Sequence, residues 1–119
     1  MRVLVVEDER DTADALAWGL AAEGYVVDLA DNGVDGLWKA TENAYDVIVL
    51  DVMLPGLDGY QVAEQVRAVL GTRVFLVALT GFGQDEDRRR ALKAGFDAHL
   101  VKPVDLEDLS RLLASVPPG

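Results

Sequence analysis

The chain has 119 residues, no cysteine and a formal net charge of −10, from 21 acidic and 11 basic residues. This length fits one domain with one buried core, and the lack of cysteine excludes a disulfide framework and a thiolate metal site, which suits a reducing cytoplasm. No apolar run approaches the ~20 residues of a membrane span, and the negative charge repels a nucleic-acid backbone, so we expect a cytoplasmic protein that binds neither a membrane nor DNA or RNA.

Five short apolar runs alternate with amphipathic segments along the chain. The runs predict strands over residues 2–6, 25–30, 46–50, 74–79 and 97–101. The segments between them predict helices, because apolar residues recur at helical spacing, as in Ala13, Leu16, Ala17 and Leu20. Glycine is expected to end three helices, at Gly24, Gly71 and Gly95, and Asp105 to cap the last one.

The composition of the strands predicts their order in a parallel sheet with helices on both faces. The first, third and fourth strands read VLVV, VIVL and VFLVAL, without the polar interruptions of YVVDLA and DAHLV. Uninterrupted apolar strands are typical of the sheet interior, so the second and fifth strands are the expected edges. The predicted fold is the flavodoxin-like α/β class, five doubly wound β/α units in the order 2-1-3-4-5, whose ligands bind at the carboxyl ends of the strands.

Polar residues stand at those carboxyl ends. Glu7 and Asp8 follow the first strand, Asp51 the third, Thr80 the fourth and Lys102 the fifth. Each alone is compatible with a helix cap or a solvated loop, but the topology gathers all of them at one edge of the sheet. We therefore expect them to form one site.

The residue types at this edge predict phosphoryl chemistry. Crowded carboxylates repel each other unless a cation offsets their charge, and Mg²⁺ is the cation that such hard oxygen ligands favour. Lys102 adds a positive charge and Thr80 a hydroxyl donor, both suited to phosphoryl oxygens. Asp51 is the candidate nucleophile, since carboxylates form acyl phosphates.

The segments VVEDE, VIVLDVMLPGLDGY, ALTG and LVKP resemble the signature segments of receiver domains of two-component response regulators. The resemblance covers essentially the whole chain and implies a receiver domain over residues 1–116, with residues 117–119 as a tail or the start of a linker. It also implies that Asp51 is the phosphoacceptor. Glu7 and Asp8 would bind Mg²⁺ together with Asp51, and the main-chain carbonyl of Met53 would be a further ligand.

The same resemblance implies a signalling cycle. A sensor histidine kinase or phosphotransfer protein would donate the phosphoryl group, Thr80 and Lys102 would contact it, and the Lys102–Pro103 peptide would be cis, an isomer that X-Pro bonds accept at small cost. Thr80 would then move inward and leave space for a switch side chain, which is usually Tyr or Phe in this family and is His99 here. A plain edge-strand histidine is the alternative.

The signalling face is expected around the fourth helix, the fifth strand and the last helix. The fourth helix, over residues 84–95, has only Ala91 and Leu92 as clear apolar anchors. A weakly anchored helix is the one most easily shifted.

The resemblance to subfamilies changes along the chain. Up to about Ala68 the chain resembles receivers of winged-helix transcription regulators, and beyond it receivers of hybrid histidine kinases. The first branch carries Asp-Asp-Tyr before its Lys-Pro segment and an Arg on the last helix, which pair across a symmetric dimer. Here these positions are Asp97, Ala98, His99 and Leu112. The loss of two partners predicts a monomer or weak dimer, and any output domain or effector lies outside these residues.

Three other functions can be weighed against this one. A haloacid-dehalogenase-like phosphatase needs a general-acid Asp two positions after its nucleophile, where this chain has Met53. A flavin-binding module would not place the acidic loop EDERD beside a phosphate. A pseudo-receiver, a binding module without phosphorylation, stays open. We expect no enzymatic activity beyond catalysis of the chain's own phosphorylation and dephosphorylation, and we expect bulky Met53 and Phe82 to slow the approach of water.

Overall fold

The computed structural model describes residues 1–81 and 85–116. Strands and helices alternate from the N-terminus, in the order β1 (Arg2–Val6), α1 (Arg10–Ala22), β2 (Val26–Ala30), α2 (Gly33–Glu42), β3 (Val47–Asp51), α3 (Gly59–Leu70), β4 (Phe75–Thr80), α4 (Asp85–Ala94), β5 (Ala98–Val101) and α5 (Leu106–Ala114). This alternation confirms the five predicted β/α units.

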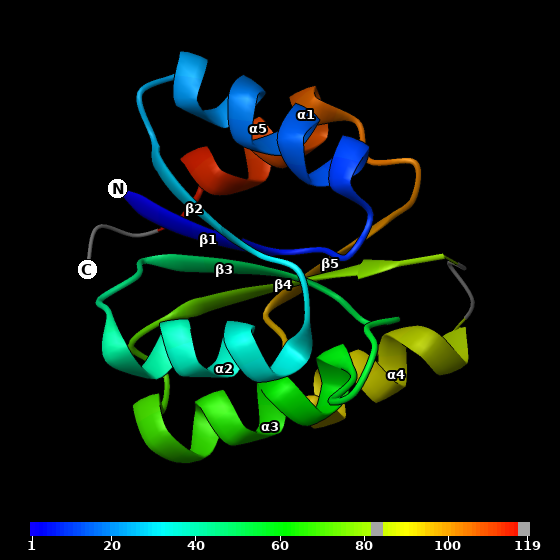
Figure 1. Ribbon diagram of the computed structural model, residues 1–119. Coiled ribbons are helices and arrows are strands. Elements are labelled where there is room, and N and C mark those ends of the chain that lie inside the picture. The colour runs from blue at the N-terminus through cyan, green and yellow to red at the C-terminus, as the bar shows by residue number, and fades with distance from the viewer. Residues whose placement is uncertain (82–84, 117–119) are drawn as a thin grey trace.

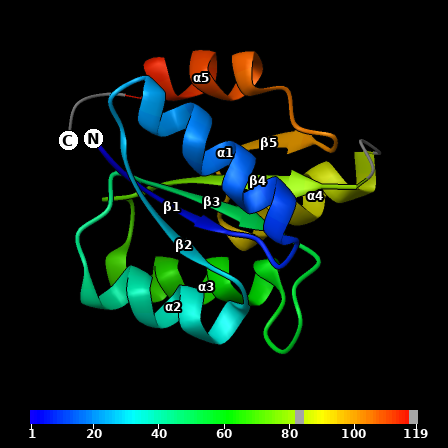
Figure 2. The same cartoon turned by 45° about the horizontal axis from the view of Figure 1, so that its top comes forward.

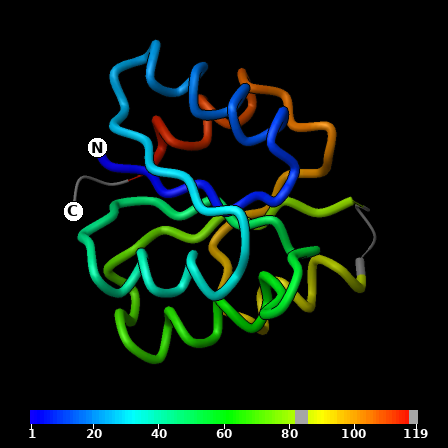
Figure 3. Tube along the Cα trace, viewed as in Figure 1, coloured from blue at the N-terminus to red at the C-terminus, as the bar shows by residue number. Residues whose placement is uncertain are grey.

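The five strands form one parallel sheet in the order β2-β1-β3-β4-β5, which confirms the predicted flavodoxin-like topology. Helices α1 and α5 cover one face, and α2, α3 and α4 cover the other (Figures 1 and 2). The chain trace leaves the first layer after α1 and returns to it only with α5 (Figure 3). The carboxyl ends of β1 and β3 therefore lie side by side, where the connections to α1 and α3 leave the sheet.

The sheet separates two apolar cores. Alternate residues of a strand point to opposite faces, so Leu4 and Ile48 pack with α2, α3 and α4, while Val3 and Val49 pack with α1 and α5. This is why the central strands read as uninterrupted apolar runs. The edge strands β2 and β5 are only partly buried, as their polar residues predicted.

Two predicted strand ends were one residue short, because Asp51 and Thr80 belong to the ladder. Asp51 pairs with Leu79 on β4, and Thr80 pairs with Val101 on β5. A polar side chain at the last position of a strand gives no sign in the sequence of whether pairing includes it.

Four predicted strand starts, at residues 25, 46, 74 and 97, were one residue early. At two of them, Asp46 and Asp97, the aspartate side chain caps the amino end of a neighbouring strand. The Asp46 carboxylate accepts a hydrogen bond from the Arg2 amide at 2.8 Å. Asp97 does the same for the Leu76 amide at 2.8 Å. Each aspartate thus closes the amino end of a neighbouring strand.

Most predicted helix ends are confirmed. Gly24, Gly71 and Gly95 follow helices with positive φ, and the Asp105 carboxylate accepts from the Glu107 amide at 2.8 Å. The fourth helix was expected from Gln84, which lies outside the described residues, as does Phe82. Leu92 was wrongly predicted as an anchor: it is 70% exposed, and Ala91 and Ala94 are the buried residues of α4. No helix among residues 1–81 and 85–116 is long and apolar enough to span a membrane.

Candidate functional site

The carboxyl ends of β1, β3 and β4 bring three buried polar side chains together. Glu7, Asp51 and Thr80 are only 1%, 3% and 2% exposed, although each is followed by a loop. Asp8 is exposed. Because successive residues leave a strand on opposite sides, Glu7 turns into the protein and Asp8 toward solvent.

Lys102 is the cation that joins the buried acids. Its Nζ donates to both carboxylate oxygens of Glu7 at 3.0 Å and to Oδ2 of Asp51 at 2.8 Å. The backbone positions this side chain, because the Lys102 amide donates to the Thr80 carbonyl at 2.7 Å. The Lys102–Pro103 peptide bond is cis. One ammonium group therefore faces two carboxylates that water scarcely reaches.

Burial and charge shift the pKa values of this group. Burial raises the pKa of Glu7 to about 7; its hydrogen bond with Lys102 opposes the rise, and its contact with Asp51 adds to it. Burial by itself lowers the pKa of Lys102, but the hydrogen bonds to Asp51 and Glu7 outweigh it, and the net shift is upward. Lys102 stays charged, while Glu7 is only partly ionised at neutral pH.

The loop after β3 shapes the other side of Asp51. The Met53 amide donates to Oδ1 of Asp51 at 2.9 Å, while the Met53 side chain is 75% exposed. Asp58 and Gln61 form a reciprocal capping box at the start of α3. The backbone thus fixes the carboxylate from the side opposite Lys102.

Gly59 is a residue of this site that sequence reasoning missed. A Cβ atom at Gly59 would lie 2.3 Å from the Asp51 carbonyl oxygen and 2.6 Å from the Val52 Cα. Only glycine allows α3 to begin so close to the end of β3. The signal was present in the Asp-Gly pair of VIVLDVMLPGLDGY, but spacing alone did not reveal the close approach.

Thr80 is buried without a partner. Its Oγ1 makes no hydrogen bond to any group within residues 1–81 and 85–116. A buried hydroxyl without a partner costs free energy of about 1–3 kcal/mol. The hydroxyl is therefore available to a group that enters the site.

The acidic residues have the chemistry and spacing of a metal site. One carboxylate oxygen from each of Glu7, Asp8 and Asp51 lies within 4.8 Å of the other two. Opposite ligands of octahedral Mg²⁺ are about 4.2 Å apart, and the ion usually keeps several waters. These hard oxygen donors therefore have the chemistry to hold one hydrated Mg²⁺ ion.

The model of the response regulator receiver domain family matches residues 3–114. The chain belongs to this family. Among curated proteins, the transcriptional regulatory protein PcoR of Escherichia coli is 44% identical to this receiver over 108 residues, which are 91% of the chain and 47% of PcoR. The receiver thus spans about half the length of the curated relatives that it matches first.

Two solved structures resemble the receiver over nearly its whole length. The receiver domain of a sensor histidine kinase from Pseudomonas aeruginosa, with a magnesium ion coordinated in its active-site cleft, is 34% identical with a TM-score of 0.89, covering 97% of this chain and 95% of that one. The receiver domain of Ssk1 from Saccharomyces cerevisiae, solved with the phosphotransfer protein Ypd1, is 30% identical with a TM-score of 0.93, covering 98% and 88%.

The expected switch residue lies apart from the charged group. His99 is half-buried on β5 opposite Ala78 of β4. The hydrogen-bond network that joins Glu7, Asp51 and Lys102 does not include it among the described residues. The receiver therefore places His99 on β5, the strand that Lys102 directly follows, and the role of His99 stays a prediction.

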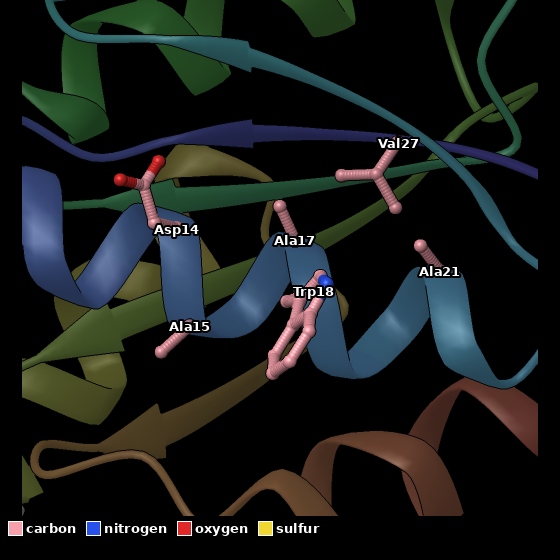
Figure 4. Close-up of a pocket in the computed structure, with 6 residues that line it drawn as sticks. All are labelled: Asp14, Ala15, Ala17, Trp18, Ala21 and Val27. Carbon is pink, nitrogen blue, oxygen red and sulfur yellow. The ribbon is translucent and has the colours of Figure 1, made fainter.

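A hollow beside α1 is separate from the acidic site. Figure 4 shows Ala17 and Ala21 pointing from α1 toward Val27 on β2, with Trp18 on the outer side of the helix. Trp18 is 85% exposed. Among the described residues, Asp14 is the only charged residue that lines the hollow, so the hollow lacks the convergent charges of the strand ends.

Proposed function

We propose that this receiver is the phosphoacceptor switch of a two-component phosphorelay. Asp51 accepts a phosphoryl group from the phosphohistidine of a sensor histidine kinase or phosphotransfer protein, in a reaction that depends on Mg²⁺. The observation that carries the proposal is the buried Asp51 carboxylate, 2.8 Å from the Lys102 ammonium and grouped with Glu7 and Asp8. The magnesium-containing kinase receiver and the Ssk1–Ypd1 complex among similar structures support it.

The residues divide the chemical work. An Asp51 carboxylate oxygen attacks phosphorus, the phosphorus–nitrogen bond to the donor histidine breaks, and the imidazole nitrogen keeps the electron pair. Glu7, Asp8, Asp51 and the Met53 carbonyl would hold Mg²⁺, which neutralises charge on the phosphoryl oxygens. Lys102 lies close enough to Asp51 to pair with these oxygens. Hydrolysis of the acyl phosphate ends the signal, so the protein catalyses only its own phosphorylation and dephosphorylation.

The signal leaves the site through Thr80 and His99. The unpartnered Thr80 hydroxyl donates to a phosphoryl oxygen and moves toward it, and His99 turns into the space that this movement leaves. The change then reaches the face formed by α4, β5 and α5.

The partners follow from the same proposal. The curated relatives matched first are transcriptional regulatory proteins about twice as long as this chain. An output domain or effector outside these residues would therefore read the signal. Asp97 is paired with Arg67 of the same chain, which leaves it less available for a partner and favours a monomer or weak dimer. We place the protein in the cytoplasm, without direct contact to nucleic acid or membrane.

Intact mass spectrometry tests this function. The protein is incubated with acetyl phosphate and Mg²⁺, beside an Asp51→Asn variant and a sample with EDTA. A phosphoryl adduct is expected only in the unaltered protein with Mg²⁺. An adduct in the variant would refute the assignment of Asp51 as the phosphoacceptor. An adduct in the EDTA sample would refute the metal role of Glu7 and Asp8.

Two added measurements separate the alternatives. A pseudo-receiver would give no adduct in any sample and would not bind beryllofluoride. A phosphatase would release phosphate continuously from added phosphomonoesters. The exposed Met53 side chain stands where such an enzyme needs its general acid, so we expect no such release.

A further inference from the structure

Arg67 connects the loop that follows its own helix, α3, to the turn between α4 and β5, which lies 28 to 30 residues further along the chain. From α3 its Nε donates to the Gly95 carbonyl at 2.8 Å, and its NH1 to the carbonyls of Gly71 and Val74 at 2.8 and 2.7 Å. Its NH2 pairs with Asp97 at 2.5 Å. The Arg67 side chain is only 17% exposed, so the rigid guanidinium satisfies backbone carbonyls where water has little access.

The turn between α4 and β5, residues Gly95 to Asp97, is fixed from several sides. Gly95 has φ of +107°, and a Cβ atom there would lie 2.6 Å from Cγ of Arg67. Phe96 is 4% exposed and packs edge-on against Tyr60 of α3. The Asp97 carboxylate binds both Arg67 and the Leu76 amide. This turn is therefore attached to α3 and β4 by backbone, ionic and aromatic contacts.

The two halves of α4 differ in their attachment. Ala91 and Ala94, in the second half, are 3% and 5% exposed, and Arg90 lies over the Tyr60 ring at 4.1 Å. From Glu86 to Arg89, none of the described side chains is buried. These contacts hold the carboxyl half of α4. The described residues of its amino half, which follows β4 and Thr80 in the chain, make few contacts.

We propose that Arg67 fixes the α4–β5 turn and with it the carboxyl end of α4. A change at the phosphoryl site then moves the amino half of the helix, and the movement does not extend past Gly95. This rests on the proposed function, because it concerns how the same site is read. Arg67 is a positioning residue: it touches neither Asp51 nor its partners among the described contacts. It confines the response to one part of the signalling face.

Hydrogen exchange with mass spectrometry tests the proposal on the whole chain, with and without Mg²⁺ and beryllofluoride. Slower exchange in residues 52–58, next to Asp51, reports that the site is occupied. In the unaltered protein we expect a ligand-dependent change over Glu86 to Arg89 and a change of less than about twofold in the amides of Gly95, Phe96 and Asp97.

Substitution of Arg67 should spread the change. In Arg67→Gln the amides of residues 95–97 should exchange about tenfold faster without ligand, and the ligand-dependent change should extend to them. Arg67→Lys keeps the charge near Asp97 but lacks the several donors of the guanidinium, so its exchange rates at residues 95–97 should lie between those of the unaltered protein and Arg67→Gln. This variant remains informative if Arg67→Gln does not fold. Arg73→Gln is the matched control, since Arg73 is exposed and its side chain makes one hydrogen bond within the described residues, to the Leu70 carbonyl at 3.1 Å. This variant should show the same exchange as the unaltered protein.

Two results would overturn the proposal. One is a ligand-dependent change in the unaltered protein that is as large at residues 95–97 as at Glu86 to Arg89. The other is an Arg67→Gln pattern identical to that of Arg73→Gln. If residues 52–58 do not respond to ligand at all, the proposed function itself fails and this inference falls with it, a result distinct from both.

Discussion

The ionised Glu7 side chain is expected to destabilise the metal-free protein above pH 7, compared with an uncharged side chain of the same size. Its pKa lies at about 7 in the folded protein, against an ordinary value of 4.5, chiefly because of burial. A carboxyl whose pKa rises on folding stabilises the folded state fully below its unfolded pKa, and this contribution is lost as pH rises through the folded pKa. The loss therefore falls between pH 4.5 and about 7.

The size of this effect follows from the shift. The rise from 4.5 to about 7 corresponds to roughly 3 kcal/mol, at about 1.4 kcal/mol for each pKa unit. The Glu7 side chain is 0% exposed, so solvent screening does not reduce this value. Glu7→Gln cannot ionise and should escape the loss. In a chain of 119 residues the gain corresponds to a Tm increase of roughly 10 °C, an upper limit because the amide pairs less well with Lys102.

Thermal unfolding in EDTA, followed by circular dichroism across this pH range, measures the effect. Glu7→Gln should match the unaltered protein near pH 4.5, exceed it increasingly up to about pH 7, and keep a constant advantage at higher pH. Glu9→Gln removes an exposed acid two residues away and serves as the control, with no pH-dependent gain expected. The reasoning is refuted if Glu7→Gln is the less stable protein above pH 7, because attraction to Lys102 would then outweigh burial.

Three further substitutions, one of them with a comparison variant, test other parts of the structure by chemical denaturation. Thr80→Val removes the unpartnered hydroxyl and should raise the free energy of unfolding by about 1–2 kcal/mol; a loss would mean that the hydroxyl has a partner. Gly59→Ala places a methyl against the Asp51 carbonyl and should cost about 3 kcal/mol or more, whereas Gly24→Ala, in open space at positive φ, should cost about 1 kcal/mol. Tyr45→Phe removes a bond to the Asp28 carboxylate and should cost about 1 kcal/mol; because burial raises the pKa of Tyr45 to about 12, this difference should be present below pH 10 and disappear as pH rises through 12.

The sheet could be predicted because burial on both faces leaves a direct trace in the sequence. VLVV and VIVL contain no polar residue, and both strands lie in the interior of the sheet. The gathering of Glu7, Asp51, Thr80 and Lys102 then follows from topology alone, since parallel strands end at the same edge. Residue type and strand order were sufficient for this part of the site.

The contacts within the site could not be predicted in the same way. Adjacent acids read alike in a sequence, yet Glu7 is buried against Lys102 and Asp8 is exposed, because the direction of a side chain depends on where the strand ends. Leu92 was taken as an anchor of α4 for being apolar, but helix phase turns it to solvent. The role of Arg67 depends on backbone carbonyls, which leave no trace in residue identity.

The central claim is that the Asp51 carboxylate is the group that becomes phosphorylated. Borohydride reduces an aspartyl phosphate to homoserine, so tandem mass spectrometry of the protein, treated with acetyl phosphate and Mg²⁺ and then reduced, locates the modified residue. We predict homoserine at residue 51, and none when Mg²⁺ is absent. Homoserine at another aspartate, or at residue 51 without Mg²⁺, would contradict the account.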